Sequence, residues 1–155
     1  MYNPHFMQLA IAEAKTGIKK GHGGPFGAVI VKDGKLIASS HNQVLKNNDS
    51  TCHGEVSAIR EAEQVLGTYD LSNCELYTTS EPCPMCLAAI LWANIKKVYY
   101  GCTLNDNAKI GFRDATINQL ITDRSKLPAN FLEEHDRALC LELFDEYAGM
   151  NKTIY

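Results

Sequence analysis

Hydrophobic and polar positions along the first third of the chain predict a helix followed by a β-hairpin. The helix begins at Asn3–Pro4, a capping residue followed by proline, and apolar residues then recur at helical spacing until the glycines that start at Gly21. A short apolar run, Phe26–Val31, precedes the turn pair Asp33–Gly34 and a return segment, Leu36–Ser39. Asp–Gly between two apolar runs is typical of a two-residue hairpin turn.

The pattern then alternates between helical and extended segments. The predicted helices are 53–66 and 83–94, and the predicted strands are 75–79 and 98–100. The order helix, strand, strand, helix, strand, helix, strand indicates an α/β sandwich layered on one sheet.

The last third of the chain predicts one more helix and no fifth strand. Asn130 and Glu133 form a capping-box pattern. Four apolar side chains share a helical stripe after it: Leu132, Leu139, Leu143 and Tyr147. Because no linker, repeat or low-complexity tract interrupts the chain, residues 1–155 are expected to form a single domain.

Composition and charge exclude several classes of protein. The 155 residues contain 15 Lys and Arg against 18 Asp and Glu, a net charge of −3, which does not suit a default nucleic-acid binder. The longest apolar run, Leu87–Ala93, is too short for a membrane span, and no export signal is visible at the N-terminus. We therefore expect a cytoplasmic protein whose six cysteines are thiols or metal ligands.

The spacing of two short motifs predicts a catalytic zinc site. His53-Gly-Glu55 is followed, after an interval of 29 residues from His53, by Cys83-Pro-Met-Cys86, the arrangement of zinc deaminases. His53, Cys83 and Cys86 supply three ligands for one Zn²⁺ per chain, which leaves a fourth position for water. Glu55 is placed to take a proton from that water and deliver it to a leaving group.

Two other interpretations of the Cys83–Cys86 pair are a redox pair and half of a zinc knuckle. A closed four-thiolate site is not favoured, because the remaining cysteines do not form a second such pair: Cys52, Cys74, Cys102 and Cys140. Cys52, next to His53, is interpreted as a small packing residue, and the other three as ordinary reduced thiols.

Two segments, Gly24–Val31 and Glu81–Cys86, carry a resemblance that covers nearly the whole chain. The chain resembles the cytidine and deoxycytidylate deaminase superfamily, and within it the bacterial guanine deaminases. The resemblance implies a three-layer α/β/α sandwich with a central mixed sheet, in which the two ligand-bearing helices pack side by side beneath the zinc.

The same resemblance implies a pocket for a purine base. Asp114, in Gly111–Asp114, matches an aspartate that contacts the purine, Asn42 matches a base-binding asparagine, and Tyr155 matches a terminal tyrosine that closes the pocket. Phe26 and Trp92 are candidates to cover the faces of the ring. The alternatives are that Asp114 is a helix cap, that Trp92 lies in the core and that Tyr155 is a disordered end.

One residue departs from the usual pattern of the superfamily, His-Ala-Glu. Gly54 stands where alanine is usual, and the missing methyl group is expected to widen the floor of the pocket. Because fungal-type cytosine deaminases also have His-Gly-Glu, this residue favours a pyrimidine base.

The function expected from these residues is hydrolysis of guanine to xanthine and ammonia. Two alternatives use the same zinc chemistry, on the adenosine of a tRNA or on a cytosine-type free base, and a third is a zinc-stabilised scaffold without catalysis. Residues 129–148 contain six acidic side chains and one basic one, which disfavours tRNA. The expected partners are a nucleobase and a second copy of the chain that exchanges residues 129–155, with no nucleic acid and no membrane.

Overall fold

Four strands form one mixed sheet in the order β2-β1-β3-β4 in the computed structural model, which describes residues 1–155. The strands are β1 (Gly27–Lys32), β2 (Lys35–His41), β3 (Cys74–Ser80) and β4 (Lys97–Cys102). β1 is antiparallel to both β2 and β3, whereas β3 and β4 are parallel. No fifth strand is present, as the sequence predicts.

The predicted hairpin joins β1 to β2. Asp33 and Gly34 both have left-handed φ angles, 51° and 72°, which a tight two-residue turn between twisted strands requires. The register shifts by one residue between Ile30 and Val31, so the hairpin contains a bulge.

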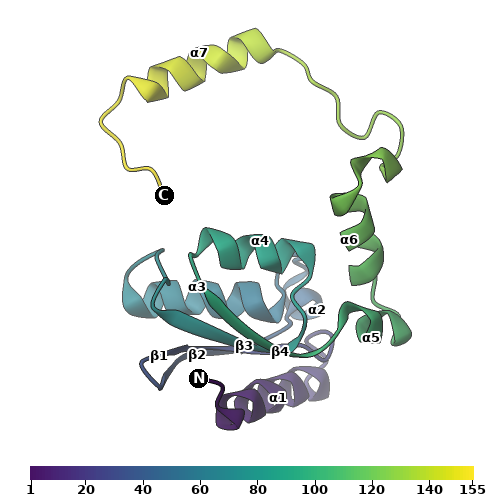
Figure 1. Cartoon of the computed structure of the whole chain (residues 1–155). Coiled ribbons are helices and arrows are strands. Elements are labelled where there is room, and N and C mark those ends of the chain that lie inside the picture. The colour runs from purple at the N-terminus through teal and green to yellow at the C-terminus, as the bar shows by residue number, and fades with distance from the viewer. The chain divides into compact units, whose positions relative to one another are not determined.

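Helices cover both faces of the sheet, which confirms the predicted α/β sandwich (Figure 1). The helix α1 (Pro4–Lys19) lies on one face, and α3 (Gly54–Leu66) and α4 (Pro84–Trp92) lie side by side on the other. The side chain of Asn3 accepts the backbone N–H of His5 and caps α1 as predicted. One core forms between the sheet and α3 and α4, and a second, centred on the fully buried Tyr77, forms under α1.

Three short helices escape the periodicity analysis: α2 (Val44–Asn47), α5 (Leu104–Lys109) and α6 (Asp114–Thr122). The start of α5 is fixed by a capping box, in which Thr103 accepts the N–H of Asp106 and Asp106 accepts the N–H of Thr103. The helices α2 and α5 are too short to show a hydrophobic period, and all three helices carry residues that line the site described below.

The chain divides into two compact units, Met1–Thr122 and Asp123–Tyr155. The second unit contains a short 3₁₀ helix, η1 (Arg124–Lys126), and α7 (Arg137–Ala148). A terminal helix is thus confirmed, but its predicted start at Asn130 is wrong. Asn130 and Asp136 both adopt left-handed φ angles, which interrupt the helical path before Arg137. No helix of the protein has the length and apolar character that spanning a membrane demands.

Candidate active site

Two of the three predicted metal ligands occupy the N-cap positions of neighbouring helices. His53 caps α3 and Cys83 caps α4, both with extended backbone angles, and neither side chain makes a capping hydrogen bond. Their side chains are therefore free to point away from the helix axis. Cys86 lies in the first turn of α4, where unpaired backbone N–H groups and the helix dipole favour a thiolate.

The three ligand atoms lie at the spacing that zinc requires. The Nδ1 atom of His53 is 3.5 Å from the Sγ atoms of both Cys83 and Cys86, and all three atoms lie within 4.8 Å of one another. A tetrahedral zinc with Zn–S of about 2.3 Å and Zn–N of about 2.0 Å separates N from S by about 3.5 Å. The donor set and its geometry thus fit zinc, with three protein ligands rather than four.

The protonation of the ligands also suits a cation. The pKa of Cys83 is lowered to about 4, because its sulfur accepts hydrogen bonds from Cys86 and from His53. The hydrogen bond with Cys83 also raises the pKa of His53. The pKa of Cys86 is raised because its proton is held between the two sulfurs in a buried position.

Glu55 lies in the first turn of α3, two residues after the ligand His53. It is 5% exposed, and its two carboxylate oxygens accept hydrogen bonds from Thr78 Oγ1 at 3.0 Å and from Cys86 Sγ at 3.4 Å. Burial raises the pKa of Glu55. A carboxyl group held in place beside a metal site, with a pKa moved toward neutrality, suits a proton carrier.

A cavity of about 330 Å³ opens over this centre. Besides His53, Glu55 and Cys83, its lining includes two aromatic residues, Phe26 and Phe112, and two polar ones, Asn42 and Asp114. The rings of Phe26 and Phe112 meet edge to face, with centroids 4.8 Å apart, and form an apolar wall. The volume and the apolar wall match a small planar ligand.

Asn42 and Asp114 present complementary polar atoms to the cavity. Asn42 lines the cavity, and its Oδ1 atom accepts the N–H of Val44 at 3.1 Å, which leaves the amide nitrogen as the donor of this side chain. Asp114 uses one carboxylate oxygen to accept from Asn107 and keeps the other as an acceptor. Asp114 is the first residue of α6, and its contact with a purine stays a prediction.

Asn107 is the residue that the sequence analysis missed. It is 3% exposed, accepts a hydrogen bond from Ser80 Oγ at 2.9 Å and donates one to Asp114 at 2.9 Å. It thereby ties the carboxylate of Asp114 to the end of β3. No motif marks it, because its role depends on contacts across 27 residues of sequence.

Two predicted pocket residues do not belong to this group. Trp92, at the end of α4, is 68% exposed and does not line the cavity, because the helix directs its last turn away from the metal centre. Trp92 therefore lies neither in the core nor in the wall of this cavity. The aromatic ring that contacts Phe26 there is the ring of Phe112. Tyr155 lies in the second unit and is exposed.

The expectation that Gly54 widens the floor of the pocket is wrong. A Cβ atom at this position would lie 3.1 Å from the carbonyl oxygen of Phe26 and 3.6 Å from the amide nitrogen of Ala28. The missing methyl group therefore concerns the packing of α3 against β1, and Gly54 does not line the cavity. It carries no information on the size of the base.

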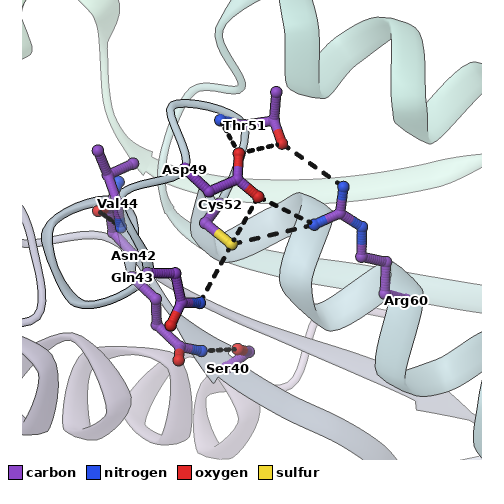
Figure 2. Close-up of polar contacts among 9 residues, drawn as sticks. Ser40, Asn42, Gln43, Val44, Asp49, Thr51, Cys52 and Arg60 are labelled. Carbon is purple, nitrogen blue, oxygen red and sulfur yellow. Dashed lines mark hydrogen bonds and ion pairs between the residues drawn. The ribbon is translucent and has the colours of Figure 1, made fainter.

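The loop that leads from Asn42 to His53 is held by a polar network (Figure 2). Asp49 accepts hydrogen bonds from Thr51 and from the buried thiol of Cys52, and Arg60 of α3 approaches both Asp49 and Cys52 at 4.0 Å. Cys52 also accepts from Asn47 at 3.4 Å. The interpretation of Cys52 as a packing residue is therefore incomplete, because its sulfur joins the polar contacts that place His53.

Fold and site together define a zinc-dependent deaminase domain. Residues 2–102 match the family described as the cytidine and deoxycytidylate deaminase zinc-binding region, and the chain belongs to this family.

The chain is similar to several proteins of known sequence or structure. It is 52% identical to guanine deaminase of Bacillus subtilis over 117 residues. The aligned residues are 76% of this chain and 75% of that protein. The solved structure of the Bacillus subtilis enzyme aligns with a TM-score of 0.90 over 100% of this chain and 99% of the other, at 42% identity. A tRNA-specific adenosine deaminase of Agrobacterium fabrum is 46% identical over 97 residues, 63% of each protein.

Proposed function

We propose that the protein hydrolyses guanine to xanthine and ammonia with one zinc ion per chain. The observation that carries the proposal is the joint placement of Asn42 and Asp114 in the cavity beside Glu55 and the metal ligands. The similarity to guanine deaminase of Bacillus subtilis over the full length of the chain supports it.

The polar atoms of the cavity complement the edge of guanine. Guanine presents N–H donors at N1 and at the 2-amino group, which the open carboxylate oxygen of Asp114 can accept. Its carbonyl oxygen and ring nitrogens are acceptors for the amide nitrogen of Asn42. The Phe26–Phe112 wall then contacts a face or edge of the ring.

The reaction replaces the 2-amino group by oxygen. A zinc ion would be held by His53, Cys83 and Cys86, and it would lower the pKa of a bound water toward neutrality. The carboxylate of Glu55 takes one proton from the attacking water and passes it to a ring nitrogen of the purine as the water oxygen bonds to C2. Glu55 then takes the second proton, from the hydroxyl group now on C2, and delivers it to the amino group; C2=O forms, the C2–N bond breaks, and ammonia leaves. The hydrogen bond from Thr78 holds the Glu55 carboxyl group in place between these transfers.

Deamination of adenosine in a tRNA is the second candidate, because relatives with that activity share the metal motif region. The acidic segment 129–148 opposes it, since binding of RNA relies on neutralising phosphates with basic side chains. A scaffold without catalysis does not account for Glu55, because a structural zinc site needs no proton carrier.

Ammonia release by zinc-loaded protein distinguishes these functions. The substrates are guanine, cytosine, adenine, guanosine, cytidine and a tRNA anticodon stem-loop. The proposal expects guanine to have the highest kcat/KM. A preference for any other substrate in the panel contradicts it, and the absence of all turnover favours the scaffold.

We further propose that the active form is a homodimer in which the second unit crosses to the neighbouring subunit and brings Tyr155 to its pocket. Support comes from α7, which has no buried residue and exposes Leu139, Leu143 and Phe144 by more than 60%. A helix with such an apolar surface is stabilised when a partner covers it.

Mixing two inactive variants tests the exchange. Glu55→Gln removes the proton carrier, and Tyr155→Ala removes the closing residue. In an exchanged heterodimer, the subunit with intact Glu55 receives Tyr155 from its neighbour, so one of the two sites becomes active, and refolding equal amounts of the two variants together restores about a quarter of the unmodified activity. If each tail serves its own subunit, no activity returns. Native mass spectrometry counts subunits and zinc ions in the same samples.

A cytoplasmic location is also part of the proposal. Cys83 and Cys86 must stay reduced to bind zinc, and the other four cysteines are free thiols, as suits a reducing compartment. Activity confined to the cytoplasmic fraction of source cells tests this location.

A further inference from the structure

A chain of three side chains links α1, β2 and the glycine-rich loop behind the cavity. The carboxylate of Glu13 on α1 lies 2.8 Å from Nδ1 of His41, the last residue of β2. The other ring nitrogen of His41 lies 2.8 Å from Nδ1 of His22, in the loop that follows α1. The two imidazole rings stack with centroids 5.1 Å apart. We call Glu13, His41 and His22 the histidine chain.

Glu13 fixes the first hydrogen bond of the histidine chain. A carboxylate only accepts, so Nδ1 of His41 carries a proton and donates it. Where Nε2 of His41 carries no proton it accepts from Nδ1 of His22, and where it carries one it donates to that atom, so the two rings are joined by a hydrogen bond in either case. Each member thus fixes the orientation of the next.

Gly17 makes room for this arrangement. It lies inside α1, and a Cβ atom there would lie 2.6 Å from Cδ2 of His41, closer than atoms can approach. The buried position of His41 therefore depends on the absence of a side chain at residue 17. The helix and the imidazole are fitted to each other.

Both histidines of the histidine chain continue directly into the wall of the cavity. His22 is followed by Gly23 and Gly24, and His41 is followed by Asn42, all three of which line the cavity. Gly23 packs so closely on Asn42 that a Cβ atom would overlap the Asn42 side-chain oxygen. A displacement of His22 is therefore transmitted to the donor amide of Asn42.

The backbone of His22 fixes a second part of the wall. Its carbonyl oxygen accepts the N–H groups of Leu45 at 3.0 Å and Lys46 at 3.1 Å, in the first turn of α2. Leu45 and its neighbour Val44 line the cavity. His22 is therefore attached to two parts of the cavity wall: to Gly23 and Gly24 along the chain, and to α2 through its carbonyl oxygen.

We propose that Glu13, His41 and His22 are positioning residues that hold Asn42 and the surrounding pocket wall in the geometry that binds the base. The proposal rests on the proposed function for the identity of that base. The histidine chain contacts neither Glu55 nor a metal ligand, so it acts on binding of the substrate rather than on proton transfer.

Three variants of zinc-loaded protein test the proposal. His22→Ala removes the hydrogen bond with His41. His22→Asn is the conservative variant, because its side-chain amide occupies the place of Nδ1 and can still form that hydrogen bond. His5→Ala, at the exposed start of α1, is the control. Two quantities are measured: amide hydrogen exchange at Leu45 and Lys46 without substrate, and KM and kcat for guanine.

His22→Ala is expected to speed exchange at Leu45 and Lys46 and to raise KM about fivefold, the typical effect of one lost hydrogen bond, with kcat changed by less than about twofold. His22→Asn and His5→Ala are expected to match the unmodified protein.

Unchanged exchange in His22→Ala overturns the proposal, as does a fall of kcat without a rise of KM. Equal damage by His22→Asn also overturns it, because the hydrogen bond would then be irrelevant. If unmodified protein does not deaminate guanine, the proposed function fails, and the exchange measurement still decides whether the histidine chain holds the wall.

Discussion

Asn107→Asp isolates the contribution of a single hydrogen bond to recognition of the base. The substitution keeps the size of the side chain and its ability to accept from Ser80, but replaces the N–H₂ group that donates to Asp114 at 2.9 Å by an oxygen. Because residue 107 is 3% exposed, water cannot take the place of the lost donor. The two carboxyl groups must then share a proton or move apart.

The size of the effect follows from the charge of the acceptor. A hydrogen bond to a charged group contributes about 1.5–3 kcal/mol, which corresponds to a change of about 10- to 150-fold. We expect kcat/KM for guanine to fall by this factor, mainly through KM, because Asp114 then turns from the base or carries a proton. Zinc content is expected to stay unchanged, since Asn107 bonds to no metal ligand.

Steady-state kinetics of ammonia release, with zinc measured by atomic absorption, supplies the assay. Asn118→Asp is the matched control, because it introduces the same charge on the exposed surface of α6 and is expected to leave kcat/KM within about twofold. Asn107→Asp with a kcat/KM equal to that of this control would refute the role of Asn107. Loss of zinc in Asn107→Asp would show instead that the residue supports the metal centre.

Three further predictions concern the metal centre and the packing of α1. Glu55→Gln is expected to keep zinc and lower kcat by about 10²- to 10⁴-fold, because an amide cannot carry the proton; turnover within tenfold of normal would contradict this. Chelation of the metal is expected to abolish ammonia release, and added zinc to restore it, whereas activity that survives in metal-free protein would exclude the zinc site. Gly17→Ala is expected to lower the free energy of unfolding in urea by about 1–3 kcal/mol despite the higher helix propensity of alanine, because its methyl group overlaps His41. In a His41→Ala background, Gly17→Ala should lower the free energy of unfolding clearly less than it does in the unmodified protein. An equal loss in both backgrounds would rule out the overlap of the methyl group with His41.

The metal centre could be predicted from sequence because its geometry is local. Cys83 and Cys86 are three residues apart at a helix start, and helix geometry alone places their sulfurs on one side. His53 and Glu55 stand in the same relation to the start of α3. The four strands and the helices α1, α3 and α4 could be predicted equally well from short-range periodicity.

The recognition half of the site followed less well, because tertiary contacts determine it. Asn107 has no motif, and Phe112 acquires its role only through its contact with Phe26. The prediction that Trp92 covers the base has the same weakness. The position of an aromatic residue on a ligand-bearing helix does not tell in which direction the last turn of that helix points. The prediction that Gly54 widens the pocket was wrong because a Cβ atom there would face the backbone of Phe26 and Ala28, at the start of β1.

Part of the recognition half also lies apart from the metal ligands along the chain. The match to the family ends at residue 102, the last residue of β4, so it contains every metal ligand and Glu55. Asn107 and Asp114 lie just beyond it, on the short helices α5 and α6, which are largely exposed. The metal half rests on two helix starts packed against a buried sheet, where a change of residue disturbs the core. Asn107 and Asp114 rest on short helices at the surface, where residues can change without unfolding the protein. A single fold can therefore keep its hydrolytic chemistry while the segment after β4 sets the base that it accepts, and exchange of residues 103–122 alone should move substrate preference without loss of zinc.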